Sequence, residues 1–503
     1  MSERSSLRVY NTLTRTVEPF VPREPGKVGV YVCGMTVYDL CHIGHARAMM
    51  AFDVIVRYLR SAGYEVNHVR NHTDVDDKII ARAKQLGKGG LEVSAEYIAE
   101  LDRDLDAVGL VRPTVEPRVS TSIPEILEVI RLLMEGGHAY QGASGDIYFS
   151  VENFPEYGKL SGRKLEDLRA GERVEVNQEK RHPGDFVLWK SVAGPATVLG
   201  AEPCWDSPWG VGRPGWHIEC SGMSRRYLGD SFDMHGGGID LIFPHHENEI
   251  AQSECATHVS PMSRYWLHNG HLSLGGPDGP IKMSKSLGNV ITIRDLLATV
   301  PAEVLRLCYL EVHYRSPLLW GPDVLANATG ALDRLYQAKE LVEEVMATGT
   351  EAPIDSLGEH GEEVFVLASA FPLRFRNSMD DDFNTAAAMG FLFELVRAVN
   401  RFGNDRKRRR QGKLALAPVK EAFRLCAEVL GIGGYSPAAF FDELKVKRLG
   451  PAVAEVEAMV AARARARAEK DWAAADRLRL ELESRNVVVM DGADGSTWRV
   501  RVS

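Results

Sequence analysis

The stretch Gly29-Val30-Tyr31-Val32-Cys33, followed after a short loop by His42-Ile43-Gly44-His45, decides the fold of this chain. The first five residues are apolar and short enough for a buried strand. A helical pattern then continues to Gly63, and a second strand-like run covers Tyr64 to Arg70. Five apolar residues share one face of that helix: Ala51, Val54, Ile55, Tyr58 and Leu59. Because a strand–loop–helix–strand unit binds nucleotides at the helix N-terminus, the sequence predicts a Rossmann-type α/β domain.

Two imidazoles flank Gly44 at the start of the predicted helix. They can hydrogen-bond an anion, and the glycine lets that anion approach closely. Taken alone, this pattern is as typical of two surface histidines near a helix cap as it is of an anion-binding site. A second motif decides between these interpretations.

That second motif is Lys282-Met283-Ser284-Lys285-Ser286, which follows a Gly/Pro-rich stretch from Gly275 to Pro280. We expect the Gly/Pro stretch to be an irregular loop. Two mobile ammonium groups beside such a hinge can stabilise the charge that develops as a polyphosphate breaks. A lone Lys-x-x-Lys is usually a solvated surface, so the motif gains meaning only from its pairing with His42 and His45.

Four residues are candidate metal ligands: Cys33, Cys220, His245 and Glu249. His245 and Glu249 stand at i and i+4 and therefore share one helical face. Two thiolates, an imidazole and a carboxylate would make a tetrahedral zinc site. No CxxC pair is present, so spacing alone favours buried cysteines beside a surface histidine pair over a metal site.

Length and composition fit a large enzyme of roughly three domains. The 503 residues are 45% hydrophobic and include seven scattered cysteines, which indicate a reducing cytoplasm. No signal peptide and no apolar run of membrane length is visible, so we expect a cytoplasmic protein that contacts no membrane.

The charge is unevenly distributed along the chain. The net charge is −9, but Arg401 to Ser503 holds 21 Lys and Arg against 14 Asp and Glu. A basic C-terminal segment suits a nucleic-acid partner. Its candidate contacts are Arg463, Arg467 and Lys470 for phosphates and Trp498 for base stacking, although a merely solvated helix explains any single patch as well.

The histidine motif and the lysine motif, in this order, resemble the paired signature of class I aminoacyl-tRNA synthetases. The resemblance implies that both motifs embrace ATP while an aminoacyl-adenylate forms. It assigns catalysis to His42, His45, Lys282 and Lys285, and ATP binding to Thr36, His42, Gly44, His45 and Lys285. Mg²⁺ is expected to accompany the ATP.

Within that class the chain resembles the cysteinyl-tRNA synthetase family from about Val9 to its C-terminus. The resemblance rests on the segments 33–39, 73–78, 215–220, 236–240 and 244–249. It implies one zinc ion on Cys33, Cys220, His245 and Glu249, and a cysteine pocket lined by Thr73, Trp216 and Asp240, with Asp240 facing the substrate ammonium. His72 departs from relatives, which usually carry an aliphatic residue there.

The expected zinc has a physical logic. Cysteine and serine differ by sulfur for oxygen, a change that an apolar pocket rejects poorly. Zinc prefers thiolate and lowers the pKa of a coordinated thiol, so the substrate sulfur can bind it directly. We see no large insertion that would house an editing domain.

The predicted architecture is a Rossmann catalytic domain with a connective insertion, followed by a helical bundle and a small C-terminal α+β module. We expect a helix from Ile293 to Tyr314, a helix cap at Asp380-Asp381-Asp382, and a helix from Val453 to Arg485 followed by a hairpin. The expected domains are 9–121 with 195–281 (catalytic), 122–194 (insertion), 282–329 (lysine motif), 330–430 (bundle) and 431–503 (anticodon-binding module).

The resemblance implies a monomeric cysteine–tRNA ligase that uses ATP, L-cysteine and tRNA-Cys. Two alternatives are open. A ligase that transfers cysteine to an amino sugar, as in mycothiol synthesis, would share every active-site motif, but such ligases end shortly after the helical bundle. A catalytically silent zinc and nucleic-acid-binding relative would have no use for both halves of an ATP site.

Overall fold

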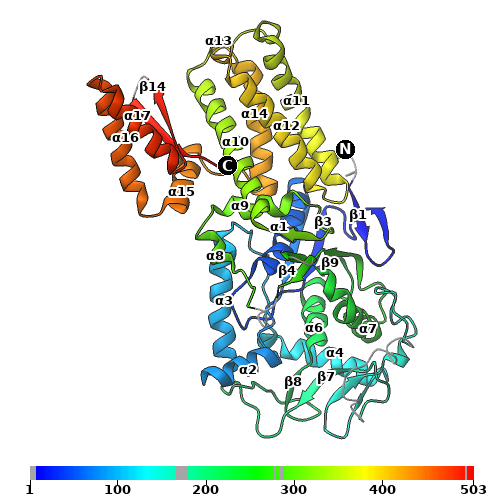
Figure 1. The fold of residues 1–503 in the computed structure, drawn as a ribbon. Helices are drawn as coiled ribbons and strands as arrows, with labels where there is room; N and C mark the ends of the chain where they lie inside the picture. Colours follow the sequence, from blue (N-terminus) through cyan, green and yellow to red (C-terminus); the bar gives the residue numbers. More distant parts are fainter. Residues whose placement is uncertain (1–6, 166–178, 277–278, 284–287, 493–494, 503) are drawn as a thin grey trace. The chain divides into compact units, whose positions relative to one another are not determined.

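The computed structural model describes residues 7–165, 179–276, 279–283, 288–492 and 495–502. The chain forms two compact units (Figure 1). Unit 1 comprises Met1–Leu272, Tyr314–Leu318 and Asp380–Phe383, and unit 2 comprises Ser273–His313, Leu319–Met379 and Asn384–Ser503. Among the described helices, none combines the length and apolar character needed to cross a membrane.

A four-stranded parallel sheet forms the centre of unit 1. Its order is β10-β9-β3-β4, from β3 (Lys27–Val32), β4 (Glu65–Arg70), β9 (Phe232–Gly238) and β10 (Ser263–Asn269). The strands carry runs of consecutive buried residues, as expected for a parallel sheet covered on both faces. Helix α1 (Ile43–Ser61) connects β3 to β4. The predicted Rossmann-type fold is therefore confirmed.

The insertion between β4 and β9 carries a four-stranded antiparallel sheet in the order β5-β6-β7-β8. These strands are β5 (Ala139–Gln141), β6 (Ile147–Phe149), β7 (Phe186–Ser191) and β8 (Gly212–Pro214). Helix α4 (Ile123–Glu135) shares one apolar core with the parallel sheet, in which Ile126 and Ile130 join Tyr31 and Trp266. Because β8 ends at Pro214, the antiparallel sheet extends past residue 194, the end that we expected for the insertion.

Four further helices and a hairpin belong to the described part of unit 1. Helices α2 (Asp77–Leu86) and α3 (Gly90–Ala107) pack on each other, and α6 (Trp216–Leu228) and α7 (Glu247–Thr257) pack on α4. The N-terminal strands β1 (Arg8–Asn11) and β2 (Thr16–Pro19) pair as an antiparallel hairpin.

Unit 2 begins with a small sheet where we expected an irregular loop. Strand β11 (Leu272–Gly276) pairs with β12 (Gly279–Lys282), and β13 (Leu318–Trp320) lies on the other side of β11. The expectation for Gly275 to Pro280 was wrong because Gly275 and Pro280 face each other in the ladder, and Gly279 has a φ of 122° that only glycine adopts easily.

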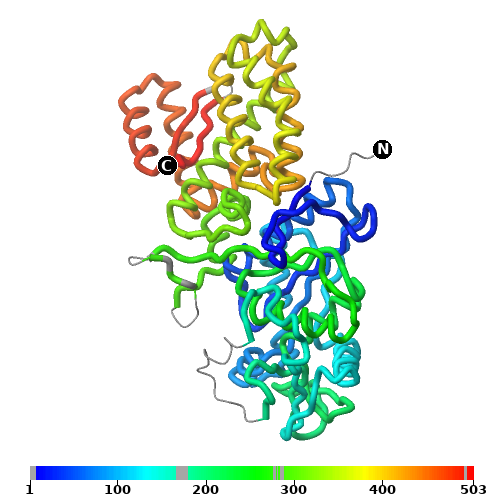
Figure 2. The backbone as a smooth tube through the Cα atoms, turned by 90° about the vertical axis from the view of Figure 1, so that its right-hand side faces the viewer, coloured from blue at the N-terminus to red at the C-terminus, as the bar shows by residue number. Residues whose placement is uncertain are grey.

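Two short helices replace the single helix expected from Ile293 to Tyr314. They are α8 (Ile293–Leu297) and α9 (Ala302–Leu310), and Pro301 interrupts the pattern between them. Figure 2 shows the long bundle helices of unit 2 side by side. They are α10 (Pro322–Thr348), α11 (Gly358–Asp380), α12 (Thr385–Gly403) and α14 (Lys413–Leu425), with the short α13 (Arg406–Arg409) and η7 (Cys426–Leu430).

We expected the acidic motif Asp380-Asp381-Asp382 to cap a helix, but it caps neither of its neighbours. Asp380 is the last residue of α11, and the side chain of Asn384 caps α12 by accepting the N–H of Ala387. The aspartates make other contacts, which are described below.

The C-terminal module contains α15 (Pro437–Leu449), α16 (Ala452–Ala468), α17 (Trp472–Ser484) and the hairpin β14 (Val487–Gly492) with β15 (Gly495–Val500). The hairpin is as predicted, but the single helix from Val453 to Arg485 is two. Lys470 has a φ of 63°, and Asp471 caps α17 by accepting the N–H of Ala474. A local Asx cap therefore outweighs the continuous helical pattern.

Candidate active site and metal centre

The predicted site residues of unit 1 gather at the carboxyl ends of the parallel strands. Cys33 directly follows β3, Thr73 lies three residues after β4, and Asp240 follows β9. Thr36 and Thr73 form a backbone bridge that joins the loops after β3 and β4. In open parallel sheets this edge is where ligands bind, because the loops that leave the strands meet there.

The four candidate metal ligands converge, although they come from three separate stretches of chain. The ligand atoms of Cys33, Cys220, His245 and Glu249 all lie within 4.8 Å of one another. The two Sγ atoms are 3.7 Å apart, and Cys33 Sγ lies 3.5 Å from Glu249 Oε1. His245 Nε2 lies 3.0 Å from the same oxygen.

These distances suit a tetrahedral zinc ion. Zn–S bonds of about 2.3 Å give a tetrahedral S···S edge of about 3.8 Å, and Zn–N and Zn–O bonds near 2.1 Å give an edge of about 3.4 Å. The observed sulfur–sulfur distance of 3.7 Å matches the first value. The nitrogen–oxygen distance of 3.0 Å is slightly shorter than the second, as a direct hydrogen bond between the two groups would make it. The donor set therefore fits the metal that the sequence predicts.

Local structure explains how the ligands meet. Cys220 lies in α6, and Glu249 lies in the first turn of α7. His245 precedes α7 in the widened turn η4 (Ile242–His246). Gly34, next to Cys33, permits a close approach, because a Cβ there would lie 1.6 Å from the Asn71 carbonyl oxygen. Glycine at this position therefore lets the loop of Cys33 lie against the end of β4.

A second set of potential ligands, Cys33, His235, His246 and Glu249, shares two members with the first. His235 Nε2 contacts Glu249 through Oε2 at 2.9 Å, whereas Cys33 and His245 approach Oε1. This second set leaves out the Cys220 thiol, whose sulfur is the softest donor beside Cys33. We therefore assign His235 to orienting the Glu249 carboxylate, as a partner that supports a metal ligand from outside.

Burial controls the charges of these groups. It raises the pKa of the Cys33 thiol well above its usual range, and the neighbouring Cys220 and Glu249 raise it further. Burial lowers the pKa of His245 and of His217 to about 3, so both rings are neutral near pH 7. A cluster of two thiols, a carboxylate and neutral imidazoles lacks positive charge, and a divalent cation would supply it.

The predicted cysteine-pocket residues differ in how deeply they are buried. Trp216 is 42% exposed, and its indole stacks on the His245 ring with centroids 4.4 Å apart. Thr73 is buried, and its Oγ1 accepts a hydrogen bond from Asn71 Nδ2 at 3.3 Å. Asp240 is exposed in the short helix η3 (Ile239–Leu241). The structure thus provides an aromatic wall, a hydroxyl and a solvent-facing carboxylate.

The histidine motif begins α1, as predicted. His42 is the N-cap, and its Nδ1 accepts the N–H groups of Gly44 at 3.1 Å and His45 at 3.3 Å. The two imidazoles stack with centroids 3.6 Å apart. Two partly exposed rings at the positive end of a helix form a site for an anion. Lys285 lies outside the described residues, and for Lys282 only the backbone is described, at the end of β12.

The predicted tRNA contacts are unequal. Trp498 is only 8% exposed and packs in the core of the C-terminal module with Val456 and Leu482. Arg463 is also buried, and both its terminal nitrogens bind Asp491, at 2.9 and 3.0 Å. These two side chains therefore hold the module together. Lys470 and Arg467 are both exposed, and Arg467 pairs with Asp491.

The structure reveals an exposed aromatic side chain that we did not predict. Trp472, at the first position of α17, is 59% exposed. The signal lay in the sequence Asp471-Trp472, where a tryptophan follows a helix cap and shares no apolar face with its neighbours.

Contacts among buried and half-buried histidines were also missed. His246 Nδ1 lies 2.8 Å from His268 Nε2, and His268 Nδ1 lies 2.8 Å from Thr12 Oγ1. His217 Nδ1 lies 3.0 Å from His245 Nδ1. Histidines at strand ends and in helix first turns were visible in the sequence, but their mutual contacts depend on three-dimensional packing.

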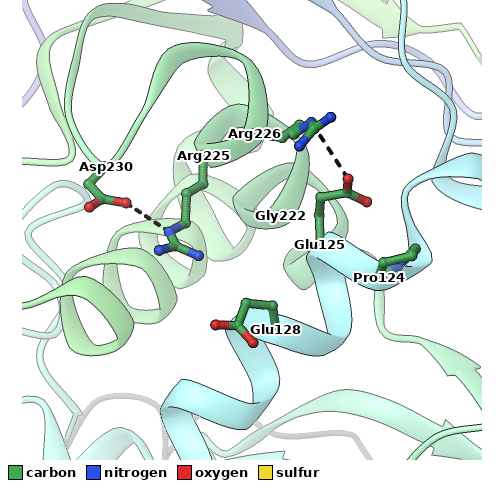
Figure 3. A pocket seen from close by; sticks show the side chains of 7 residues that line it. All are labelled: Pro124, Glu125, Glu128, Gly222, Arg225, Arg226 and Asp230. Atoms are coloured by element: carbon green, nitrogen blue, oxygen red, sulfur yellow. Dashed lines mark hydrogen bonds and ion pairs between the residues drawn. The ribbon is translucent and has the colours of Figure 1, made fainter.

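A cavity of about 410 Å³ lies between α4 and α6 (Figure 3). Four of its charged side chains pair with one another: Arg225 Nε contacts Asp230 at 2.7 Å, and Arg226 Nε lies 3.6 Å from Glu125. The lining contains none of the metal, ATP or cysteine candidates. We assign no role to it.

The parallel sheet, the histidine motif at the start of α1 and the sites at the strand ends define a class I aminoacyl-tRNA synthetase. Residues 19–330 match the family model described as tRNA synthetases class I (C) catalytic domain. Methionyl-tRNA synthetase of Mycobacterium tuberculosis, solved with methionyl-adenylate, has the same fold with a TM-score of 0.59 and 16% identity, over 83% of this chain and 93% of that chain.

Two further models match the later part of the chain, a DALR domain at residues 374–433 and a cysteinyl-tRNA ligase anticodon binding domain at 452–499. The cysteine–tRNA ligase of Geotalea uraniireducens is 51% identical over 99% of this chain and 100% of its own length. That of Geobacter sulfurreducens is 50% identical, also over 99% and 100%. The chain belongs to the cysteine–tRNA ligase family, whose members are ATP-dependent ligases.

Proposed function

We propose that this chain activates L-cysteine with ATP, transfers the cysteinyl group to the 3′ end of tRNA-Cys, and selects cysteine through one zinc ion. The observation that carries the proposal is the convergence of Cys33, Cys220, His245 and Glu249 at the carboxyl ends of the parallel strands. A cytoplasmic location and a monomeric state stay predictions from the sequence.

The side chain of the substrate is recognised beside these four ligands. Bound zinc would supply a soft cation that prefers a thiolate to a hydroxyl group, which separates cysteine from serine. His235 holds the Glu249 carboxylate through Oε2, so the ligand keeps its orientation. Trp216 covers the His245 ring and limits water access, and the exposed Asp240 is available to the substrate ammonium.

The adenylate forms at the N-terminus of α1, the helix that follows β3. An oxygen of the cysteine carboxylate attacks the α-phosphorus of ATP, and pyrophosphate leaves with the electron pair of the broken P–O bond. His42 and His45, stacked at the N-terminus of α1, hold phosphate oxygens. Lys282 and Lys285 stabilise the departing pyrophosphate, and Mg²⁺ accompanies ATP. Positioning and charge stabilisation supply the catalysis.

The acceptor is a tRNA whose anticodon region contacts the C-terminal module. Support comes from the match of residues 452–499 to an anticodon binding domain. The exposed ring of Trp472 and the neighbouring Lys470 offer a stacking face and a cation on the surface of the module. Lys470 thus stays a candidate for direct contact, and Trp472 takes the place of Trp498, which is buried like Arg463.

The first test removes one metal ligand. Cys220→Ser should lower the bound zinc from about one ion per chain to a small fraction, because a hydroxyl group is a poor zinc ligand. Cysteine-dependent ATP–pyrophosphate exchange should fall by about two orders of magnitude or more. Metal analysis and exchange kinetics measure both effects.

Cys255→Ser is the matched control, since Cys255 is a buried thiol of α7 outside the four-ligand cluster. It should keep its zinc. Undiminished, tightly bound zinc in Cys220→Ser would refute the ligand assignment.

The second test concerns the acceptor. The intact protein, labelled cysteine and bulk tRNA should give cysteinyl-tRNA in an aminoacylation assay. Cysteine activation without tRNA charging, together with transfer to a glucosamine–inositol acceptor, would replace the tRNA proposal by the small-molecule one.

A further inference from the structure

The segment Ser273–His313 leaves unit 1 and later returns to it. The chain departs after Leu272 and comes back at Tyr314. The two ends are bonded to each other inside unit 1: the Gly270 N–H donates to the Tyr314 carbonyl at 2.8 Å, and the Leu318 N–H donates to the His271 carbonyl at 2.9 Å. This segment carries the lysine motif. We call residues 270–271 and 314–318, where the segment leaves and rejoins unit 1, the base of the segment.

The base is tightly packed. A Cβ on Gly270 would lie 2.5 Å from the Ser316 carbonyl oxygen and 2.6 Å from that of Arg315. Any side chain at residue 270 would therefore push the two strands of the base apart, and the chain has glycine there.

Arg47 binds both ends of the base at once. It lies in α1, two residues after His45, and is only 3% exposed. Its Nη1 donates to the His271 carbonyl at 2.8 Å, and its Nη2 donates to the Ser316 carbonyl. One guanidinium thus connects the helix that begins with the histidine motif to the departing and the returning chain.

The acidic motif described above holds the returning end from a second direction. Asp382, also 3% exposed, accepts hydrogen bonds from Tyr314 Oη at 3.0 Å and from Arg315 Nε at 2.6 Å. It also accepts the N–H of Tyr10 at 2.8 Å. Asp380 accepts a hydrogen bond from Tyr58 Oη of α1 at 2.6 Å.

The backbone of this motif is strained where it makes these contacts. Asp382 and Phe383 both have a φ of 55°, a left-handed conformation that L-residues avoid. The Phe383 ring packs edge-on against Tyr58 of α1 at 6.1 Å and against Tyr314 at 6.5 Å. Such strain persists only where surrounding contacts enforce it, and it is commonly found at functional sites.

From these contacts we infer that Arg47 and the motif Asp380–Phe383 clamp the base of the lysine-motif segment onto the histidine-motif helix. Arg47 and Asp382 are positioning residues for adenylate formation, because they set where the segment starts and ends relative to His42 and His45. The inference rests on the proposed function, in which the two motifs act on one ATP molecule.

The first experiment compares variants of two arginines on α1. Arg47→Met should lower the kcat of cysteine-dependent ATP–pyrophosphate exchange by about 10–100-fold, since a displacement near 1 Å costs a rate factor of this size. The KM for cysteine should change by less than about threefold and the zinc content should stay the same. The reason is that the candidate zinc ligands and the residues of the cysteine pocket lie outside α1. Arg47→Lys should recover part of the rate, and Arg60→Met, on the exposed end of α1, should match the parent.

The second experiment uses neighbouring aspartates. Asp382→Asn should reduce kcat with the same sparing of the cysteine KM, whereas Asp381→Asn, an equal charge change on an exposed side chain, should not. If the two positioning residues act on one geometry, Arg47→Met combined with Asp382→Asn should lose less than the product of the single effects.

The outcomes separate the two proposals. A parent protein without cysteine-dependent exchange would refute the proposed function itself. An active parent with Arg47→Met equal to Arg60→Met, and Asp382→Asn equal to Asp381→Asn, would overturn the clamp. So would parallel losses of zinc, cysteine affinity and kcat in both Arg47→Lys and Asp382→Asn, because those would indicate a purely structural role.

Discussion

Uncharged imidazoles dominate the site at the scale of single residues. Burial lowers the pKa of His268 to about 3, as it does for His217 and His245, and lowers that of His246 well below the usual range. For His245 the nearby Glu249 carboxylate favours the charged ring, yet burial outweighs it. A neutral imidazole is the form that coordinates a metal ion, so the packing prepares the ring for that role.

His68 lets the consequence of such burial be measured away from the metal candidates. It lies in β4, and burial, followed by the charges of Arg70 and Arg60, lowers its pKa to about 3. In the unfolded chain the His68 imidazole has a pKa near 6.5. Below that pH the unfolded chain therefore binds a proton at His68 that the folded chain does not bind. The stability that depends on a neutral His68 is present above pH 6.5 and is lost as the pH falls toward 3.

We therefore predict that His68→Leu flattens the acid side of the stability profile. The difference should reach about 1.4 kcal/mol per pH unit between pH 6 and pH 4. Urea unfolding of the parent and the variant at several pH values measures it. His360→Leu, at an exposed histidine, should run parallel to the parent, and equal slopes for all three proteins would show that His68 is not buried as a neutral ring.

At the scale of elements, the break between α16 and α17 decides which tryptophan can meet a nucleic acid. We predict that Trp472→Ala lowers the kcat/KM of tRNA charging by about tenfold or more, since stacking on one base contributes about 1–3 kcal/mol. Its effect on stability should stay within about 0.5 kcal/mol, because the ring is exposed. Charging assays and thermal unfolding measure the two effects.

Trp498→Ala provides the contrasting variant. Its ring belongs to the module core and faces the Lys445 ammonium at 4.8 Å. The module should lose about 3–5 kcal/mol of stability, and charging should fall with it. Charging that is unchanged in Trp472→Ala while the module stays folded would remove Trp472 from the acceptor contacts.

The elements also show what the sequence could predict. Strand β3, α1, the histidine cap and the C-terminal hairpin followed from apolar periodicity and turn residues, since these are local signals. The hairpin through Gly275 and Pro280 and the helix cap at Asp471 could not be predicted in this way. Strand pairing in the first case and a side-chain cap in the second decided the structure against the local composition. Cys33 and Cys220 meet although 187 residues separate them, and only the resemblance to a family placed them together before the fold was known.

For the whole molecule, the structure suggests where the acceptor function can be removed. Helix α15 packs on the bundle, with Phe440 stacked on Tyr336 of α10 at 4.0 Å. The linker before it is held by Glu303, which accepts the N–H groups of Gly433 and Gly434 at 3.0 Å each. A cut after Gly450 preserves these contacts, whereas a cut at the predicted boundary of 431 would break them.

We predict that a chain ending at Gly450 keeps ATP–pyrophosphate exchange within a few-fold and loses tRNA charging by about two orders of magnitude. The reason is that none of the candidate residues for the metal, cysteine and ATP sites lies beyond this point, while the matched anticodon binding domain does. Exchange and charging assays on the same preparation measure both. A chain lacking only Arg501 to Ser503 is the control, and full charging by the Gly450 truncation would contradict an acceptor role for the module.

The stacking of Trp216 on His245 links the fluorescence of one tryptophan to the candidate metal site. An indole that is partly in water and lies 4.4 Å from the imidazole of a metal-ligand candidate changes its light emission when that ring gains or loses a charged neighbour. The difference in fluorescence between the parent and Trp216→Phe therefore isolates one ring among the eight tryptophans of the chain. We predict that metal loading and cysteine binding change this difference signal in real time, without any turnover of ATP.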